Sequence, residues 1–471
     1  MVESREIEKN EKIERLLVTK KMRSMSGVSI ITILTKDYPC PGKCIYCPQE
    51  KGVPKSYLSN EPAVMRAILN EYDPARQVLS RIESLKKQGH PVDKVELIVI
   101  GGTFSCLPHD YQESYIKACL DAMNGFESKA LDEAKTANEK AEHRCVGLTL
   151  ETRPDYINEK EVEWFRYLGA TRVELGVQAL DDKILAINLR GHKVSETINA
   201  TRLLKDAGFK VCWHLMPNLY GSNVEKDKKM FREVFSNPDF RPDYIKIYPC
   251  MVIKGAPLYD LWKEGKYTSY SNEELLEVIK NIKSHVPYWV RILRTIRDIP
   301  SVSIESGSKT SNLRQVVQRE MKMENLSCKC IRCREVGSAN KNNIDGKDKK
   351  LFVEEYESSG GKEIFLSFES ADRKVIYSLL RLRLTSNQFL YEIKDCALIR
   401  EVHTYGQQAE IGEEGDTQHR GMGKKLILEA ERIVKENGFR KIAVISGIGV
   451  RDYYRKQNYK LIGEYMVKEL V

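Results

Sequence analysis

Short runs of apolar, mostly β-branched residues alternate with longer amphipathic stretches through the first two-thirds of the chain. Six of these runs predict strands, at 28–34, 95–100, 145–150, 172–177, 209–215 and 243–248. The stretches between them predict helices, at 75–88, 110–122, 158–168, 195–207 and 225–236. Apolar strands joined by helices are typical of a parallel sheet that is buried on both faces. Six such units, with 288–293 as a candidate seventh strand, predict an α/β domain over 28–290 that forms a partial (β/α)6-type barrel.

A second folded region follows a polar stretch. Residues 338–350 (SANKNNIDGKDKK) contain almost no apolar side chains, which predicts a linker or exposed loop. Beyond it, strands are predicted at 363–369, 374–384, 397–404 and 441–446, with helices near 422–437 and 449–456 and a final strand. Consecutive strands with few helices are typical of a separate α+β domain, here expected over 351–471.

The composition is that of a globular protein. Hydrophobic residues make up 41% and charged residues 30% of the 471 residues, which excludes an intrinsically disordered chain. No stretch approaches the ~20 apolar residues that span a bilayer. The charged N-terminus also lacks the apolar core of a signal peptide. We therefore expect no membrane segment and a cytoplasmic location.

Basic charge is concentrated in one part of the chain. Lys and Arg exceed Asp and Glu by 76 to 67, and residues 291–334 hold ten basic residues against four acidic ones. A concentrated basic segment is typical of a surface that binds a polyanion. The alternative is a solvated face with counter-charges elsewhere. A short basic arm is also expected at 1–27, where Lys20, Lys21 and Arg23 lie close together.

Half of the twelve cysteines form two tight groups, and the other six are scattered singly and are predicted to be small core residues. The two groups are Cys40, Cys44, Cys47 and Cys328, Cys330, Cys333. Disulfides are not expected in a cytoplasmic protein.

The first group follows the first predicted strand. Three closely spaced thiolates suit an iron–sulfur cluster with one iron left open for a ligand. A zinc loop with a distant fourth ligand is the alternative.

The spacing of the second group suits zinc, which takes four Cys or His ligands in structural sites. Only three such ligands are local, so the fourth would come from elsewhere in the chain or from water. Three unligated thiols are the alternative. A metal here would hold the basic connector at 291–337 in place.

Polar or glycine residues follow most of the predicted strands. They are Gly101 and Gly102 after the second strand, Glu151 after the third, Gln178 after the fourth, His214 at the fifth and Lys246 in the sixth. The carboxyl ends of parallel strands meet at one rim, where α/β barrels place their chemistry. A glycine pair at that rim allows close approach of a ligand. For each residue taken alone, a structural hydrogen-bonding role is the alternative.

A glycine-containing loop precedes the predicted helix at 422–437. Its sequence is Gln418-His-Arg-Gly421-Met422-Gly423-Lys424. Backbone N–H groups of such a loop, together with the helix N-terminus, suit a pyrophosphate. Further on, Tyr453 and Tyr454 follow a second glycine-containing turn. A phenol there is a candidate general acid for a leaving thiolate, and packing is the alternative.

These motifs resemble those of two known families. Cys-x3-Cys-x2-Cys with Tyr46 before the last cysteine resembles the radical S-adenosylmethionine (SAM) signature, and the Gln-x-x-Gly-x-Gly loop resembles that of the Gcn5-related N-acetyltransferases. Both in one chain resemble the family of Elongator catalytic subunits, which are tRNA uridine carboxymethyltransferases. Supporting stretches are Glu151-Thr-Arg-Pro-Asp and Lys246-Ile-Tyr-Pro. One departure is Cys47-Pro-Gln-Glu, where many members have Cys-Pro-Gly-Gly.

The resemblance implies a set of cofactors and the residues that hold them. Cys40, Cys44 and Cys47 would hold a 4Fe–4S cluster, with SAM near Gly101, Gly102 and Glu151 and zinc on Cys328, Cys330 and Cys333. Acetyl-CoA would bind at Lys94, Glu401, Val402, His403, Thr404, Gln418, Gly421, Met422, Gly423, Lys424 and Tyr454. Tyr454 and Lys246 are the candidate catalytic residues.

The resemblance also implies a reaction. A SAM-derived deoxyadenosyl radical takes hydrogen from the methyl group of acetyl-CoA, the carbon radical attacks C5 of the wobble uridine of a tRNA, and thioester hydrolysis leaves 5-carboxymethyluridine. The basic segment would face the tRNA, and a homodimer or a larger Elongator-like assembly is expected. Two rival hypotheses are a protein lysine acetyltransferase with a structural iron–sulfur domain, and a tRNA-binding protein without catalysis.

Overall fold

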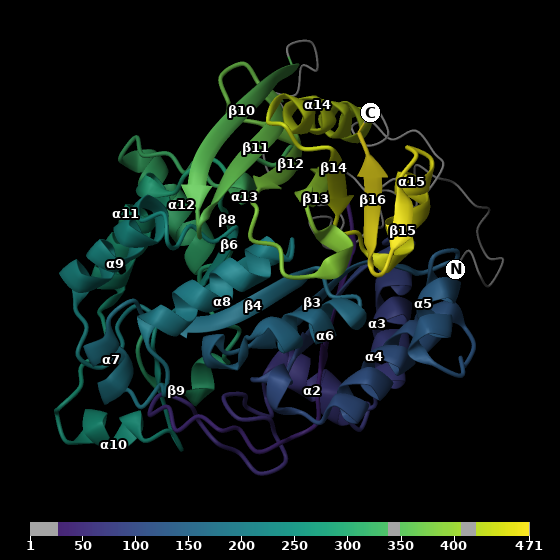
Figure 1. Cartoon of the computed structure of the whole chain (residues 1–471). Coiled ribbons are helices and arrows are strands. Elements are labelled where there is room, and N and C mark those ends of the chain that lie inside the picture. Colours follow the sequence, from purple (N-terminus) through teal and green to yellow (C-terminus); the bar gives the residue numbers. More distant parts are fainter. Residues whose placement is uncertain (1–26, 338–348, 407–420, 471) are drawn as a thin grey trace, which may run out of the picture.

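The computed structural model describes residues 27–337, 349–406 and 421–470 and contains two seven-stranded sheets (Figure 1). The arm expected at 1–27, except its last residue, lies outside the described residues, as do Gln418 and most of the linker expected at 338–350. Among the described residues, no helix is both long and apolar enough to cross a membrane.

The first sheet is parallel and open, which confirms the partial barrel. In spatial order its strands are β1 (Ser29–Leu34), β2 (Lys94–Ile100), β3 (Arg144–Thr152), β4 (Arg172–Gln178), β5 (Lys210–Leu215), β6 (Tyr244–Ile247) and β8 (Arg291–Arg294). All six predicted strands are present, and β8 confirms the candidate seventh. Because β8 pairs with β6, the sheet extends into the segment that was expected to be a connector.

Helices pack around this sheet (Figure 1). They are α2 (Pro62–Leu69), α3 (Pro74–Lys87), α4 (His109–Asn124), α5 (Leu131–Asn138), α6 (Glu159–Tyr167), α7 (Asp182–Ile187), α8 (Val194–Asp206), α9 (Val224–Ser236), α10 (Leu258–Lys263), α11 (Asn272–His285), α12 (Leu313–Met323) and α13 (Ile331–Arg334). Short 3-10 turns lie at Phe104–Cys106, Pro154–Tyr156 and Ser301–Ser303, and β7 (Val252–Ile253) pairs with β9 (Ile304–Ser306).

Strand β2 shows how the sheet separates two environments. Val95, Leu97 and Val99 are fully buried in the core under the helices, whereas Lys94 and Glu96 alternate with them and are half-buried. Since side chains alternate between the two faces of a strand, the polar residues lie on the concave face. The concave-face side chains Glu174 and Lys246 are also buried, so the sheet is buried on both faces as predicted, but its concave face carries many polar side chains.

The second sheet forms the C-terminal domain, above the first sheet in Figure 1. In spatial order its strands are β10 (Lys349–Ser358), β11 (Gly361–Ser370), β12 (Ile376–Leu384), β13 (Cys396–Thr404), β14 (Lys441–Val444), β16 (Tyr465–Glu469) and β15 (Lys460–Ile462). Its helices are α14 (Met422–Glu436) and α15 (Arg451–Arg455), with 3-10 turns at Tyr391–Ile393 and Ile448–Val450. Pairing is antiparallel except between β13 and β14.

Two details of this domain differ from the prediction. The edge strand β10 was not predicted, because half of its residues are exposed and Glu and Lys interrupt its apolar positions. The single last strand is in fact a hairpin, β15 and β16.

The C-terminal domain contacts the first sheet at the amino ends of its strands. A Cβ on Gly447 would lie 2.2 Å from the carbonyl oxygen of Val146, and one on Gly449 would lie 2.5 Å from the Cβ of Arg144. Both Val146 and Arg144 are at the start of β3. Only glycine therefore permits this close approach of the two domains.

A buried network of ion pairs joins the same two surfaces. Arg400 on β13 donates to both carboxylate oxygens of Asp243, at 2.6 and 2.8 Å, and to Glu363 on β11 at 2.8 Å. Arg383 on β12 donates to Asp206, at the end of α8, at 2.6 Å. All five side chains are at most 1% exposed. Charges buried to this degree are stable only when each is paired.

We predict that Asp243→Asn, which keeps the size of the side chain and removes its charge, lowers the free energy of unfolding by about 3–5 kcal/mol, because Arg400 stays buried without its bidentate partner. Chemical denaturation monitored by circular dichroism measures the effect. The control is Glu429→Gln in the exposed pair with Arg432, which should cost at most about 1 kcal/mol. An equal, small shift for both variants would contradict the assignment.

Candidate functional site

One cavity of about 1000 Å³ lies between the concave face of the first sheet and the C-terminal domain. Its lining includes most of the residues singled out in the sequence: Cys40, Cys44, Cys47, Lys94, Gly102, Glu151, His214, Lys246, Glu401, Val402, His403, Thr404, Gly421, Met422, Gly423, Lys424 and Tyr454. Two candidate sites that are far apart in the sequence therefore share one space.

The cysteine loop and the C-terminal domain lie at opposite ends of the first sheet. The loop follows the carboxyl end of β1, and the C-terminal domain contacts the amino ends of β3, β5 and β6. Six residues of β1 at about 3.3 Å each span roughly 20 Å. The cavity runs along the concave face over this distance.

The cysteine loop is shaped around Gly42. A Cβ at Gly42 would lie 3.6 Å from the sulfur atoms of both Cys40 and Cys44, and 2.5 Å from Nη1 of Arg153. That guanidinium nitrogen is buried and has no hydrogen-bond partner among the described residues. Three thiols on one loop, beside an unpartnered cationic donor, suit an anionic group such as an iron–sulfur cluster with one open iron.

The pKa of the Cys44 thiol is lowered to about 4. The hydrogen bond from Cys47 lowers this pKa most, and the charge of Arg190 also lowers it against the opposing effect of burial. Cys44 is therefore held in the thiolate form, which is the form that binds metal.

The glycine pair lets β2 end close to the start of the cysteine loop. Gly101 has φ = 142° and Gly102 has φ = 99°, both in the region that favours glycine. A Cβ at Gly101 would lie 2.1 Å from Oγ1 of Thr35. Gly101 thus packs against the loop and does not line the cavity, whereas Gly102 does.

Glu174 is the centre of a group of charges on the concave face. It is fully buried, accepts a hydrogen bond from Lys246, and lies 2.8 Å from Nε2 of His214. Burial opposes its ionisation, but Lys246, His214 and Arg172 together hold the pKa of Glu174 well below its usual range. Despite its own burial, Lys246 has a raised pKa because of Glu174. This pair therefore stays ionised.

The same group extends to the rim of the sheet. Nδ1 of His214 lies 3.6 Å from Glu151, which accepts a hydrogen bond of 2.9 Å from the hydroxyl of Tyr57. Potential ligand atoms of Glu174, Cys212 and His214 lie within 4.8 Å of one another. The ammonium group of Lys246 already occupies this position, so the geometry favours an ion pair over a metal site.

The candidate acetyl-CoA residues lie at the other end of the cavity. Strand β13 pairs with β14 over Cys396–Ile399 and continues to Thr404 along the cavity wall. Glu401 accepts hydrogen bonds from Tyr244 on β6 and, at 2.8 Å, from Arg381. Burial opposes ionisation, yet Arg381 and Lys210 lower the pKa of Glu401 to about 2. Its side chain therefore holds β13 against the first domain.

Helix α14 begins at the cavity, with Gly421 as its N-cap at φ = 70°. Met422, Gly423 and Lys424 form its first turn and line the cavity. Its N–H groups therefore face the space in which a phosphate would be bound.

Both tyrosines of α15 line the cavity, but their surroundings differ. Tyr454 is 6% exposed and packs against Tyr459 in the core of the C-terminal domain, and burial raises its pKa. Tyr453 is 42% exposed, and its hydroxyl oxygen lies 3.1 Å from the Cβ position of Gly423. Tyr454 therefore remains protonated at neutral pH, as a general acid must.

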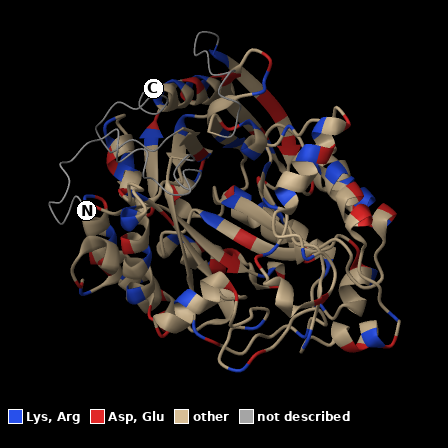
Figure 2. Cartoon of the chain, turned by 180° about the vertical axis from the view of Figure 1, so that it is seen from behind, with Lys and Arg blue, Asp and Glu red and all other residues tan. Residues whose placement is uncertain are grey.

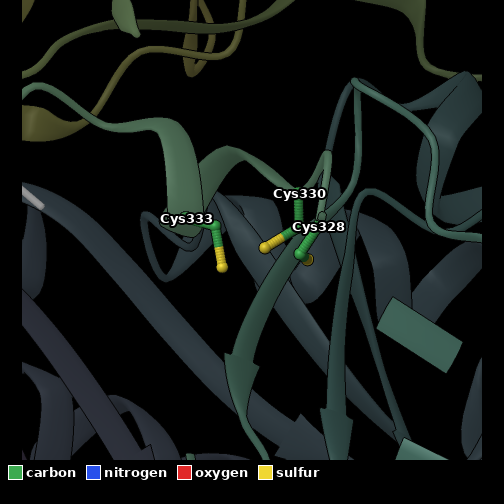
Figure 3. A group of neighbouring side chains, drawn as sticks. All are labelled: Cys328, Cys330 and Cys333. Atoms are coloured by element: carbon green, nitrogen blue, oxygen red, sulfur yellow. The ribbon is translucent and has the colours of Figure 1, made fainter. Parts of the chain in front are cut away.

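The fold also places the three sulfur atoms of the second cysteine group close to one another. The sulfur atoms of Cys328, Cys330 and Cys333 lie within 4.8 Å of one another at the start of α13 (Figure 3). Nζ of the fully buried Lys283 lies 3.4 Å from the sulfur of Cys333. No carboxylate lies within ion-pair distance of Lys283 in the part of the chain that the structure describes.

The basic segment 291–334 is only partly a surface. Arg291 pairs with Glu335 at 2.8 Å, Arg297 with Glu61 at 2.9 Å and Arg334 with Glu369 at 2.7 Å. Its exposed basic residues are Arg294, Lys309, Arg319, Lys322 and Lys329. Figure 2 shows Lys and Arg intermixed with Asp and Glu over the face seen from behind. Three of the ten basic side chains therefore pair with glutamates inside the fold, and the prediction of a polyanion-binding surface rests on the exposed ones.

Several cavity residues were not identified from the sequence. They are Tyr57, Glu96, Arg153, Arg172, Glu174, Arg190 and Lys210. Glu96, Arg172 and Glu174 alternate with buried apolar residues within strands, and this alternation was the available signal. Arg190 lies in a loop without any such signal.

The chain has close counterparts among known proteins. The Radical SAM superfamily matches residues 39–234, and the Radical SAM C-terminal domain matches residues 242–323. The tRNA uridine(34) acetyltransferase of Methanocaldococcus infernus is 51% identical over 469 residues, which cover 97% of this chain and 88% of the relative. This chain belongs to that family.

Further relatives agree with this membership. Elongator complex protein 3 of Homo sapiens is 41% identical over 474 residues, which cover 96% of this chain and 86% of the relative. The solved structure of the archaeal Methanocaldococcus infernus Elp3 with an N-terminal deletion has a TM-score of 0.85 and 48% identity, covering 95% of this chain and 100% of that one. The resemblance stated from the sequence is thus confirmed. Because the chain matches the Radical SAM superfamily, membership of this family implies that a 4Fe–4S cluster and SAM are its cofactors.

We predict that Cys44→Ala reduces iron–sulfur absorbance and 5′-deoxyadenosine formation to background after anaerobic reconstitution, since two thiolates do not replace three. The matched control is Cys106→Ala, in the next loop of the rim, where a half-buried thiol lies near Cys40. This control should keep its cluster. Full iron content and deoxyadenosine formation in Cys44→Ala would refute the assignment of the loop.

Proposed function

We propose that the protein modifies the wobble uridine of tRNA, using SAM-derived radical chemistry and acetyl-CoA to form 5-carboxymethyluridine. The observation that carries this proposal is the single cavity lined by both the cysteine loop and the first turn of α14. An acetyltransferase that used its iron–sulfur domain only as a scaffold would not require the two sites to share one space. The names of the relatives supply the tRNA substrate and the position of the uridine.

Each end of the cavity has its own task in this proposal. Cys40, Cys44 and Cys47 hold the cluster, and Gly102 and Glu151 bound the space for SAM. When bound, these groups supply a deoxyadenosyl radical that can take hydrogen from the acetyl methyl group. Glu151 is oriented by Tyr57 and His214, which fix where it can accept a hydrogen bond.

The acetyl-CoA end lies about 20 Å away along the sheet. The pyrophosphate would bind at the first turn of α14, from Gly421 through Met422 and Gly423 to Lys424, with Gln418 contributing from outside the described residues. The pantetheine arm would follow Glu401, Val402, His403 and Thr404 and then the concave face past Lys94. The length of the cavity therefore fits an extended arm that carries the acetyl group toward the rim.

Two residues would act on the acetyl group itself. Lys246 stays protonated beside Glu174, so its ammonium group can stabilise negative charge that develops on the thioester oxygen. Tyr454, at the other end of the cavity, can donate its proton to the departing CoA thiolate once the arm has withdrawn from the rim. Hydrolysis would then complete the carboxymethyl group.

The connector supplies a second proposed metal site. Three thiolates and Zn²⁺ carry a net charge of −1, which the buried ammonium group of Lys283 offsets. We propose that zinc on Cys328, Cys330 and Cys333 fixes α13 beside α12, whose exposed cations would face the tRNA.

A cytoplasmic location and a homodimer or Elongator-like assembly remain predictions.

The test is anaerobic reconstitution with iron, sulfide, dithionite, SAM, acetyl-CoA and tRNA, followed by mass spectrometry of the nucleosides. We expect 5-carboxymethyluridine only when all components are present, and a label from the acetyl methyl carbon of acetyl-CoA in the product. Acetylation of a lysine peptide without any modified uridine would instead establish a protein acetyltransferase.

We predict that Tyr454→Phe slows tRNA-stimulated release of free CoA thiol by about 10²-fold, the usual contribution of a general acid. The cluster content should not change, because Tyr454 lies at the opposite end of the cavity. Tyr453→Phe is the matched control and should keep the wild-type rate. If Tyr453→Phe is slow and Tyr454→Phe is not, Tyr453 is the proton donor and the assignment of Tyr454 is wrong.

We predict that Arg319→Gln combined with Lys322→Gln weakens tRNA binding and lowers the slope of log affinity against log salt by about 0.7–0.9 for each lost phosphate contact. Both side chains are exposed on α12. Arg314, on the same helix, is unsuitable because its guanidinium donates to the carbonyl oxygens of Ile292 and Leu293.

The matched control for this experiment is the pair Lys129→Gln and Lys140→Gln, two exposed lysines that flank α5. Fluorescence anisotropy with labelled tRNA at several salt concentrations gives both slopes. A slope that falls only in the control pair would place the tRNA on the other side of the protein.

A further inference from the structure

Arg190 lies in the loop after α7, with its guanidinium buried against the cysteine loop. The residue is 6% exposed, and its Nη1 lies 3.7 Å from the sulfur of Cys44. Its Nε donates to the carbonyl oxygen of Gly176 at 3.2 Å, and its Nη2 donates to the same oxygen. A Cβ at Gly176 would lie 2.7 Å from this Nη2. The end of β4 therefore needs glycine to admit the guanidinium.

The two loops are also joined through their backbones. The N–H of Ile45, next to Cys44, donates to the carbonyl oxygen of Asn188 at 3.2 Å. The side chain of Asn188 donates in turn to the carbonyl oxygens of Ile184 and Tyr220, both at 2.8 Å. The position of Arg190 relative to Cys44 is thus set by the backbone as well as by the side chain.

The charge of Arg190 lacks a carboxylate partner. Within residues 27–337, 349–406 and 421–470, no Asp or Glu oxygen lies within 4.0 Å of its guanidinium. The neighbouring Asp155 pairs instead with Arg153, at 2.7 Å. A buried cation without a counter-charge is strongly destabilising. The sulfur of Cys44 is the group beside Arg190 that can supply the opposite charge.

Other buried arginines of this protein show how a buried guanidinium charge is usually stabilised. Arg400 and Arg383 are paired with carboxylates. Arg166 pairs with no carboxylate among the described residues, but it donates to three carbonyl oxygens, those of Ala170, Ser446 and Glu464. Arg190 has one carbonyl oxygen, and its remaining polar contact is a cysteine of the loop. Its environment is therefore that of a counter-charge for the cysteine loop.

We propose that Arg190 is the counter-charge of the iron–sulfur cluster and raises its reduction potential. This inference rests on the cluster part of the proposed function only. A 4Fe–4S core with charge +2 on three thiolates has a net charge of −1, and reduction by one electron from an external donor makes it −2. A fixed cation stabilises the more negative state more strongly, particularly where water is excluded. Arg190 thereby makes the cluster easier to reduce and positions Cys44.

The experiment compares Arg190→Lys, which keeps the charge, with Arg190→Gln, which removes it. Both proteins are reconstituted anaerobically without tRNA or acetyl-CoA, and titrated with dithionite in the presence of redox mediators while the cluster is followed by electron paramagnetic resonance. At a fixed ambient potential we expect the ratio of reduced to oxidised cluster in Arg190→Gln to fall about tenfold, which equals about 59 mV for one electron. Arg190→Lys should stay close to the wild-type value.

A distant control is Arg432→Gln, on the exposed face of α14, which should leave the potential unchanged. Loss of iron in Arg190→Gln with retention in Arg190→Lys would also support a counter-charge. An unchanged potential in Arg190→Gln would overturn the proposal, and so would equal loss of iron in both variants, since that identifies a steric role. Because neither tRNA nor acetyl-CoA is present, failure of the modification reaction would leave this result unaffected.

Discussion

The ion network of Arg400, Asp243 and Glu363 fixes how the two domains of this protein pack against each other. Its charges are buried between the sheets, where an unpaired ion would cost several kcal/mol. Because the guanidinium of Arg400 is planar and binds Asp243 through both oxygens, the network specifies an orientation as well as a contact. The C-terminal sheet is thereby held at the amino ends of the barrel strands. That placement produces a single cavity instead of two separate sites.

The C-terminal domain covers the concave face of the first sheet and leaves a cavity between them. This face therefore can carry charged side chains. In a complete barrel this face would be packed with apolar side chains. Here Glu174 pairs with Lys246 and Arg172, and Arg172 also pairs with Glu96, so the four charges balance. Such a surface can border a polar ligand and still exclude most water, so charges placed on it act strongly. A pantetheine arm, with its amides, is a chemically suitable occupant.

The two cysteine groups follow a common electrostatic rule. Each has one buried cation close to a sulfur atom, Arg190 beside Cys44 and Lys283 beside Cys333. Three thiolates with the expected metal group would carry a net negative charge in both cases. The two proposed metal sites, of different chemistry, would thus be stabilised by the same means. The difference in function lies in access, because only the first group faces the cavity.

The sequence by itself determined the strands of the first sheet and the motifs whose residues lie close together along the chain. Apolar periodicity placed all seven strands of the first sheet, since a strand buried against helices must be apolar on that side. The spacing of Cys40, Cys44 and Cys47 predicted an iron–sulfur loop, and that of Gly421 and Gly423 located the start of α14. Edge strand β10 escaped because exposed strands carry little periodic signal.

Only the tertiary structure decided which charges face solvent and which face one another. Arg291 and Arg334 belong to a segment that is basic in the sequence, yet both pair with glutamates inside the fold. Arg190 gives no signal along the chain, because its significance comes from a cysteine 146 residues away. Burial and pairing depend on contacts between distant segments, and these exist only after the sheets have closed around the cavity.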